Sequence, residues 1–331
     1  MKNQVLTQKR IMFILIAVLL VFVIQNISYA QGRGKIYWTE TAWNWRSNIG
    51  KIRRANLNGT AAEDLVTGLF GPVDIALDLQ NRKMYWTDRT LDKIQRSNLD
   101  GTNVEVIVKK DTLTISPNCI ALDVNSNKIY WGNWRREIIQ RANLDGSDVE
   151  NLTIEERILP QNLIIDQLIS AQNIKLDLKA DKLYWTNVFG GKIARANLDG
   201  SNAEDLVTKN KGVYGLALDI QAGQMYWSNA ATGKIQRSNL NGWNVKDIVT
   251  GLRYPHGIEL DMRSRKIYWV NWDWETFTGK IQRANLDGSN VTDILTGLDR
   301  PSAIALDPNG FYDVSSDTDK LTTTWANVKI Q

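Results

Sequence analysis

Short apolar runs alternate with polar turn residues along most of the chain. In the stretch 213–252 the apolar runs are 216–220, 225–227, 235–240 and 245–249, and Gly, Asn and Asp separate them. Apolar runs this short, bounded by turn residues, are typical of β-strands and not of helices. We therefore predict four consecutive strands and no helix in this stretch.

Three short sequence words each occur six times. A Tyr-Trp pair begins at Tyr37, Tyr85, Tyr130, Tyr184, Tyr226 and Tyr268. An Asn-Leu-Asp-Gly or Asn-Leu-Asn-Gly word begins at Asn56, Asn98, Asn143, Asn197, Asn239 and Asn285. An apolar run closes with Leu-Asp at Asp78, Asp123, Asp177, Asp219, Asp261 and Asp307. Asp-Gly and Asn-Gly accept the positive φ angles of a tight hairpin, and a repeat of 42 to 54 residues indicates a stacked or circular repeat protein.

The repeats predict an all-β fold. Six four-stranded sheets with two apolar faces each bury those faces best when they stand around a common axis. The first repeat lacks its Leu-Asp strand, and a spare Leu-Asp strand follows the last repeat at 301–307. We therefore predict a six-bladed β-propeller over residues 31–307, with a ring that is closed when the C-terminal strand joins the N-terminal blade.

The repeated words resemble those of the low-density lipoprotein receptor class B repeat, the YWTD propeller, over residues 34–307. The resemblance implies a noncatalytic receptor-type module that binds proteins or peptides on one face. Only Asp88 keeps the fourth letter of YWTD, so we expect this position to act by hydrogen bonding and not by charge. The other five copies carry Glu40, Asn133, Asn187, Asn229 and Asn271. The family's cysteine-rich flanking modules are missing, which favours a free-standing bacterial exported propeller over an endocytic receptor.

The first thirty residues predict an export signal. Lys9 and Arg10 precede the apolar stretch 11–24, and the small residues Ser28 and Ala30 favour cleavage after Ala30. We expect an exported protein that contacts a membrane only if this segment stays uncleaved as an anchor. The tail 308–331 has no place in six blades, and either an edge strand or a sorting signal would explain it.

Charge and cysteine content narrow the function classes. Without Lys2, Lys9 and Arg10 the chain has 37 basic and 36 acidic side chains, which gives no reason to expect nucleic acid as a partner. Cys119 is the only cysteine, so no intramolecular disulfide can form and packing must stabilise the fold. We expect a monomer that needs no cofactor.

Residues that recur in all six repeats are predicted to be structural. An arginine stands two positions before every hairpin Asn: Arg54, Arg96, Arg141, Arg195, Arg237 and Arg283. We expect these arginines to pair with the six Leu-Asp carboxylates. The six Tyr-Trp pairs are expected in the core between blades.

Loop lengths separate the two faces of the predicted ring. From each Leu-Asp aspartate to the next Tyr there are seven residues, and from each hairpin Asn to the aliphatic residue of the fourth strand there are nine. On the other face, Tyr and hairpin Asn are thirteen residues apart in blades 2 to 5 but nineteen in blade 1 and seventeen in blade 6. The crossing 154–172 is also long. A rigid scaffold with one variable end is typical of a binding surface.

The long loops predict a binding patch for a protein or peptide ligand, or for a glycan. Aromatic side chains with charges around them are typical of interaction patches. The candidate residues are Trp43, Trp45 and Arg46 of blade 1, Trp134 and Arg135 of blade 3, and Trp272, Asp273, Trp274, Glu275 and Phe277 of blade 6. In the alternative interpretation, the loops of blades 1 and 6 pack on each other and seal the seam of the ring.

Residues just before each first strand should line the mouth of the central channel. These are Asp74, Asn118 with Cys119, Asn173, Tyr214, His256 and Ser302. Asp74, Asn118 and Asn173 would be the ligands of a shared cation in a calcium-dependent lactonase, and any imidazole mechanism would rest on His256, the only histidine. This channel mouth contains one carboxylate, which favours a binding module over a hydrolase.

Overall fold

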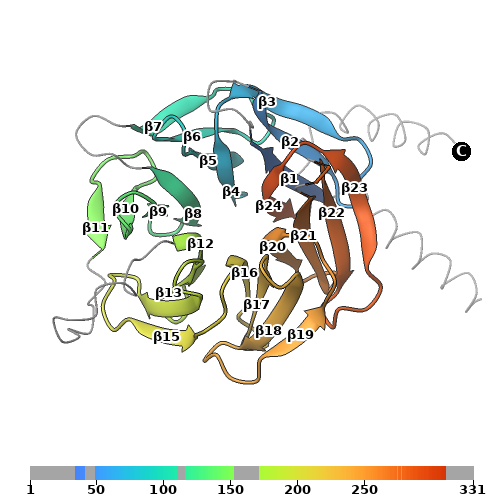
Figure 1. The fold of residues 1–331 in the computed structure, drawn as a ribbon. Helices are drawn as coiled ribbons and strands as arrows, with labels where there is room; N and C mark the ends of the chain where they lie inside the picture. Colours follow the sequence, from blue (N-terminus) through green and yellow to red (C-terminus); the bar gives the residue numbers. More distant parts are fainter. Residues whose placement is uncertain are drawn as a thin grey trace, which may run out of the picture.

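The protein is described by a computed structural model that covers residues 34–41, 49–109, 116–152, 171–273, 275–276 and 278–310. Across these residues, strands β1 to β24 form six four-stranded antiparallel sheets that stand as blades around a central axis (Figure 1). The predicted all-β, six-bladed propeller is confirmed. The described part of the chain contains no helix with the length and apolar character needed to cross a bilayer.

The blades follow one another along the chain. Blade 1 contains β24 (Pro301–Asp307), β1 (Lys35–Glu40), β2 (Gly50–Asn56) and β3 (Glu63–Leu69). Blade 2 contains β4 (Pro72–Asp78), β5 (Lys83–Asp88), β6 (Lys93–Asn98) and β7 (Glu105–Lys109). Blade 3 contains β8 (Pro117–Asp123), β9 (Lys128–Asn133), β10 (Ile138–Asn143) and β11 (Glu150–Leu152).

The second half of the ring repeats this order. Blade 4 contains β12 (Ala171–Asp177), β13 (Lys182–Asn187), β14 (Lys192–Asn197) and β15 (Glu204–Val207). Blade 5 contains β16 (Val213–Asp219), β17 (Gln224–Asn229), β18 (Lys234–Asn239) and β19 (Lys246–Val249). Blade 6 contains β20 (Pro255–Asp261), β21 (Lys266–Asp273), β22 (Thr278–Asn285) and β23 (Thr292–Leu298).

Blade 1 closes the ring, as predicted. Its inner strand β24 comes from the C-terminal end of the repeats and pairs antiparallel with β1, with Lys35 opposite Asp307 and Trp38 opposite Ile304. The signal segment and the tail lie outside the described residues except for the turn 308–310, so both assignments stay predictions.

The six Tyr-Trp pairs lie in the core, as predicted. Each tyrosine is at most 2% exposed and each tryptophan at most 4%. They pack in clusters that join adjacent blades; one cluster contains Tyr226 of blade 5 and Trp269 of blade 6. Large aromatic side chains on both faces of each blade therefore hold the ring together.

The glycine of the hairpin word is required for two reasons. Gly146 has a φ of 87°, which disfavours any residue with a side chain. A Cβ atom at this position would lie 1.8 Å from the carbonyl oxygen of Ile107 in the preceding blade. The hairpin of blade 3 thus packs against the outer strand of blade 2, and the hairpin glycines of blades 1, 2, 5 and 6 show the same approach to the preceding blade.

The expected pairing between the repeated arginines and the Leu-Asp carboxylates is wrong. Arg96 stacks on the ring of Tyr85, donates to the Leu144 carbonyl of the next blade at 3.2 Å, and forms an ion pair with Glu105 at 2.7 Å. The Leu-Asp aspartate instead caps the turn that follows it: the Asn81 amide donates to Asp78 at 2.8 Å. A short carboxylate at a strand end satisfies its own turn more readily than a distant guanidinium.

The fourth letter of YWTD acts through hydrogen bonds, as expected. Asp88 accepts from the Leu91 amide at 3.0 Å, and Asn133 accepts from the Arg136 amide at the same distance. A neutral amide oxygen caps this turn as well as a carboxylate does. Glu40 is different, because it accepts from the Trp38 indole and pairs with Arg53.

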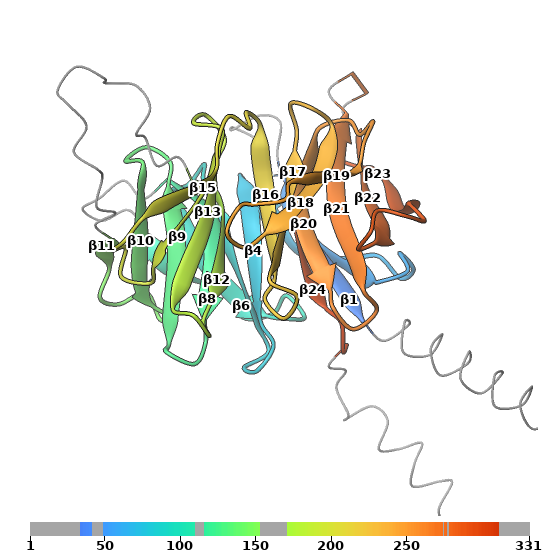
Figure 2. The same ribbon diagram turned by 90° about the horizontal axis from the view of Figure 1, so that it is seen from below.

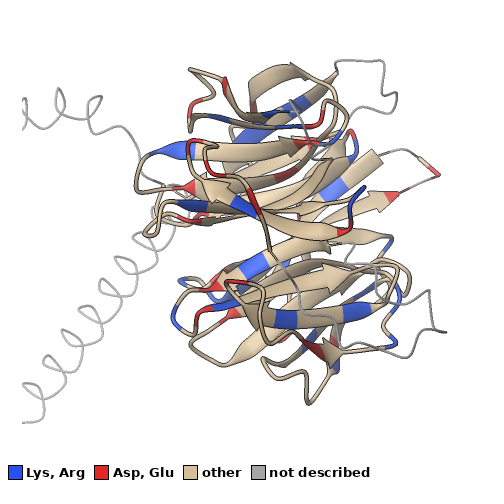
Figure 3. Ribbon diagram, turned by 90° about the vertical axis from the view of Figure 1, so that its left-hand side faces the viewer, with Lys and Arg blue, Asp and Glu red and all other residues tan. Residues whose placement is uncertain are grey.

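The propeller has two distinct faces (Figure 2). On the hairpin face, β4 joins β5 and β6 joins β7; on the loop face, β5 joins β6 and the chain crosses to the next blade. Strands β21 and β22 each have eight residues, and their additional pairs, Trp272 with Gly279 and Asp273 with Thr278, extend this hairpin on the loop face. The ends of β1 and β24 that lead to the chain termini lie on the hairpin face. Basic and acidic residues are interspersed around the ring (Figure 3).

Candidate functional site

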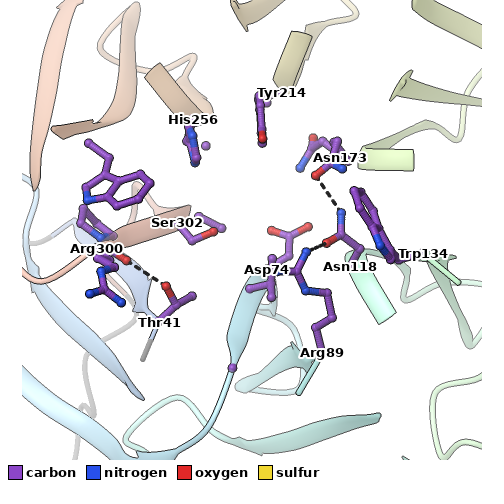
Figure 4. A pocket seen from close by; sticks show the side chains of 18 of the residues that line it. Thr41, Asp74, Arg89, Asn118, Trp134, Asn173, Tyr214, His256, Arg300 and Ser302 are labelled. Atoms are coloured by element: carbon purple, nitrogen blue, oxygen red, sulfur yellow. Dashed lines mark hydrogen bonds between the residues drawn. The ribbon is translucent and has the colours of Figure 1, made fainter. Parts of the chain in front are cut away.

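A cavity of about 300 Å³ lies at the mouth of the central channel on the loop face. All six blades contribute to its wall, and each contributes different side chains (Figure 4). Its lining includes Asp74, Arg89, Asn118, Trp134, Asn173, Tyr214, His256, Trp272, Arg300 and Ser302. The structure thus brings together the predicted channel-mouth residues and two tryptophans of the predicted patch.

The first residues of the inner strands build this wall. In blades 2, 3, 5 and 6 the inner strand begins with proline or valine, and its pairing to the second strand is irregular over the next residues. Such irregularities redirect side chains and are frequent beside functional sites. Residues that differ from blade to blade, such as Asn118, Tyr214 and His256, therefore face the axis.

Aromatic side chains of blades 5 and 6 form one side of the cavity. The rings of Tyr214 and His256 stack with centroids 4.4 Å apart, and Trp272 meets His256 edge-on at 6.3 Å. Burial lowers the pKa of His256 to about 4, so the imidazole is neutral at pH 7. Trp272, a candidate of the predicted patch, is only 9% exposed and forms part of the cavity wall.

A second aromatic pair, Trp134 and Phe189, lies on the other side of the cavity; Trp134 lines the cavity and Phe189 lies outside it. Arg89 of blade 2 lies over the Trp134 ring at 5.6 Å, and Trp134 packs against Phe189 of blade 4 at 5.2 Å. Phe189 is 67% exposed. We call Trp134 and Phe189 the aromatic ledge; it links blades 3 and 4 on the loop face.

The polar wall residues do not form a cation site. The oxygens of Asp74 accept from the amides of Ile75 and Ile120, both at 2.9 Å. Asn118 accepts from Arg89 at 3.2 Å, and Asn173 accepts from the Leu216 amide at 3.3 Å. These oxygens are occupied by N–H donors, most of them backbone amides, so the alternative of a cation shared by these three residues is not supported. Across the described residues, no group of three His, Cys, Asp or Glu is arranged to hold a metal.

An ion pair lies deeper in the channel, and we did not predict it from the sequence. Lys175 of β12 pairs with Glu259 of β20, and Ala217 occupies the corresponding position of the intervening strand β16. The signal was visible, because the repeated Ile-Ala-Leu-Asp becomes Ile-Lys-Leu-Asp at 174–177 and Ile-Glu-Leu-Asp at 258–261. Burial raises the pKa of Asp74 to about 6, and the nearby charge of Lys175 opposes this shift.

The rest of the predicted patch is divided. Trp43, Trp45, Arg46, Trp274 and Phe277 lie outside the described residues. The exposed side chain of Arg135 pairs with Asp92 at 3.6 Å. Asp273 and Glu275 both pair with Arg253, at 3.2 and 2.8 Å, on the extended hairpin of blade 6. These charged pairs lie on the loop face.

The chemistry of the described wall suits binding. Cys119 is fully buried, contacts the Ala171 carbonyl, and has a thiol pKa raised well above its usual value by burial. It is therefore a packing residue and not a nucleophile. The cavity presents stacked rings, amide groups and guanidinium groups, which can contact a ligand by stacking and hydrogen bonding.

Comparisons with known proteins agree with the repeats. The model of the family "Low-density lipoprotein receptor repeat class B" matches residues 82–124 and 265–308. Low-density lipoprotein receptor-related protein 1 of Pyricularia oryzae is 37% identical over 79 residues, which are 23% of this chain and 26% of that protein. Mouse Nidogen-2 is 38% identical over 87 residues, 26% of this chain and 6% of that protein. The alignments thus span about a quarter or less of these relatives.

Solved structures show the same architecture. A chain of the nidogen/laminin complex has a TM-score of 0.66 at 23% identity, with 82% of this chain and 98% of that chain covered. A putative 6-phosphogluconolactonase from Bacteroides fragilis has a TM-score of 0.55 at 13% identity, with 84% and 99% covered. At these identities the likeness concerns the fold alone. The chain is thus a six-bladed β-propeller in which residues 82–124 and 265–308 match the low-density lipoprotein receptor repeat class B.

Proposed function

We propose that this protein is an exported, noncatalytic binding module that holds a protein or peptide ligand over the cavity of the loop face. One observation carries the proposal: six blades that repeat the same scaffold each place different side chains around a single cavity. Aromatic anchors inside the cavity, an exposed aromatic ledge beside it and charged pairs around it have the composition of a protein-binding surface. A solved structure with the same fold is a complex between two proteins, nidogen and laminin.

A substitution that fills the cavity tests this proposal. Ser302 lies in the cavity wall at the position in blade 1 that corresponds to Tyr214 in blade 5. Ser302→Tyr would therefore add an aromatic ring to the blade 1 side of the cavity. The purified full chain is applied to peptide and glycan arrays, and the best peptide is titrated by calorimetry. We expect Ser302→Tyr to weaken binding by about tenfold or more, because the anchor site is occupied.

Ser126→Tyr is the matched control. Ser126 lies in an exposed turn on the hairpin face, so the same chemical change there should leave peptide affinity unchanged. Equal affinity of the wild type and Ser302→Tyr would remove the cavity from the proposal.

The connections whose sequence contains the predicted tryptophans Trp45 and Trp274 start and end on the loop face. Strand β1 ends and β2 begins on the loop face, and Trp45 follows β1 in the sequence; Trp274 follows β21 in the same way. The double variant Trp45→Ala with Trp274→Ala should abolish capture and leave the melting temperature nearly unchanged. A lower melting temperature with intact capture would instead favour the alternative in which these loops seal the ring.

A glycan is the second candidate ligand. Stacked Tyr214 and His256 share the cavity wall with the amides of Asn118 and Asn173, a combination that resembles a sugar site, in which rings pack on the sugar face and amides bind hydroxyl groups. Binding that appears on the glycan array alone, and that Ser302→Tyr removes, would select this candidate.

A further inference from the structure

The charges around the channel mouth do not balance. Arg89 lines the cavity, and its charge has no carboxylate partner among the described residues; Lys175 lies one pleat below. The carboxylates in this region are Asp74 and Glu259. Glu259 is paired with Lys175, and both oxygens of Asp74 accept backbone amides, so neither carboxylate is directed at the Arg89 guanidinium.

Arg89 is the clearest unbalanced charge. Its side chain donates to the Asn118 oxygen at 3.2 Å and lies over the Trp134 ring at 5.6 Å, and both partners are neutral. Among the described residues, no carboxylate lies within ion-pair distance of this guanidinium. Arg89 is exposed to solvent at the rim of the cavity, and partial desolvation of its guanidinium lowers the pKa of Arg89. Since a guanidinium has five donors, this arginine keeps donors available for a planar anion.

The aromatic ledge lies directly beside this donor. The Arg89 guanidinium, the Trp134 ring and the exposed Phe189 ring follow one another from blade 2 to blade 4. A ligand group bound at Arg89 therefore has apolar surface next to it, outside the cavity. A peptide with an acidic side chain and a neighbouring apolar side chain satisfies both features at once.

We infer that the segment which enters the cavity is an acidic peptide, with a carboxylate received by Arg89 and an aromatic or large aliphatic side chain resting on the ledge. This inference rests on the proposed function and names the ligand class of that site. At Arg89 a ligand carboxylate should bind more tightly than a neutral polar group such as an amide, because only the carboxylate neutralises the guanidinium charge.

A random peptide library displayed on phage, selected on the immobilised full chain, tests the inference. Clones that still bind Ser302→Tyr are discarded, so the remaining clones depend on the cavity. We expect Asp or Glu next to an aromatic or large aliphatic residue in these clones. The best peptide and its copy with the acid changed to the amide are then titrated against the wild type and Arg89→Gln.

The double-mutant cycle decides the result. On the wild type, changing the acid to the amide should weaken binding about tenfold or more; on Arg89→Gln, the two peptides should bind about equally. Arg136→Gln is the control with the same charge change at an exposed position on the same face, and it should preserve the preference for the acid. Phe189→Ala should reduce the preference for the apolar side chain only.

Each other outcome is decisive. Cavity-dependent clones without an acidic residue, or an acid preference that Arg89→Gln retains, overturn the inference and leave the proposed function standing. Recovery of no cavity-dependent clone overturns the proposed function, and the inference with it.

Discussion

The two faces of this propeller follow opposite rules. On the hairpin face, five of the six hairpins end with a Ser or Thr whose hydroxyl accepts from the hairpin Asn; the Asn98 amide, for example, donates to Thr102 at 2.8 Å. On the loop face, one position near the start of each inner strand, five residues before the Leu-Asp aspartate, differs in all six blades. It carries Val73, Asn118, Gln172, Tyr214, His256 and Ser302. One face repeats a single structural solution, and the other varies around a cavity.

The difference between the faces shows where packing between blades restricts the choice of residue. Each hairpin must fit against the outer strand of its neighbour, and this fit is the same at most junctions, so the same glycine and hydroxyl recur. At the channel mouth, side chains such as Tyr214 and His256 line a cavity, and no single packing arrangement recurs from blade to blade. Departures from the repeat therefore mark residues that are available for function.

Gly146→Ala should have the largest effect on the free energy of unfolding, and it tests the packing of the hairpin face. The new methyl group would lie 1.8 Å from the Ile107 carbonyl oxygen, and the backbone has a φ of 87°. We expect a loss of about 3–5 kcal/mol in the free energy of unfolding, measured by urea denaturation.

Gly223→Ala is the matched control for backbone conformation. Gly223 also has a positive φ, of 66°, but apart from its own chain neighbours no atom lies within 4 Å of the point that the new methyl group would occupy. This change should cost only about 1–2 kcal/mol. Equal losses in the two variants would show that the approach to the neighbouring blade contributes nothing.

His256→Phe should have an intermediate effect and concerns the loop face. The folded chain holds His256 at a pKa of about 4, below the value of about 6.5 that an unfolded chain has. As the pH falls through 6.5, protons bind the unfolded chain first and stability is lost, until the folded pKa is reached. The variant keeps the ring stacked on Tyr214 and should lose about 1–2 kcal/mol less than the wild type between pH 7 and pH 5.

Asp74 provides the internal control for this experiment. Its folded pKa, about 6, lies above the ordinary value of 3.8, so its contribution to stability is present at low pH and is lost as the pH rises through 6. This contribution has the opposite sign and is common to both proteins, so the difference between their pH profiles reports on His256. Parallel profiles from pH 7 to pH 5 would contradict a depressed histidine pKa.

Trp243→Thr should have the smallest effect and concerns the exception on the hairpin face. Trp243 stands where the other hairpins carry Ser or Thr, and it is 73% exposed. Blade 1 has the same word with Thr60, whose hydroxyl bonds both Asn56 and Asn58, at 2.8 and 2.7 Å. Restoring this hydroxyl should raise the free energy of unfolding by about 0.5–1 kcal/mol.

Binding at the cavity should not change in Trp243→Thr, because this hairpin lies on the opposite face. A lower melting temperature would show that the indole packs more tightly than its exposure indicates. Weaker capture of the array peptide would break the assignment of binding to the loop face.

Much of the candidate site could be predicted from residue positions. Asp74, Asn118, Asn173, Tyr214 and His256 all lie near the start of an inner strand, and the ring topology alone brings them to one mouth. The ion pair of Lys175 and Glu259 was equally readable as a break in the repeat, although we did not predict it. The exposed side chain of Phe189 has no such signal, because its packing on Trp134 joins loops of two different blades.

Local strand positions were also predicted well, with limits set by pairing. The apolar run 216–220 lies mostly within β16, but the strand begins earlier, at Val213, because the irregular pairing at its start includes polar and small residues. The partners of Arg96 could not be read from the sequence, since its carbonyl partner, Leu144, belongs to the next blade.

The sequence by itself determined the six-fold repeat, the four strands of each blade, the closing strand and the face on which loops vary. These features depend on local periodicity and on turn residues, which act within one blade. Only the tertiary structure decided that Trp272 forms the wall of the cavity and that Arg89 lies over Trp134 without a carboxylate partner among the described residues. Such contacts join different blades, and their geometry exists only once the ring has closed.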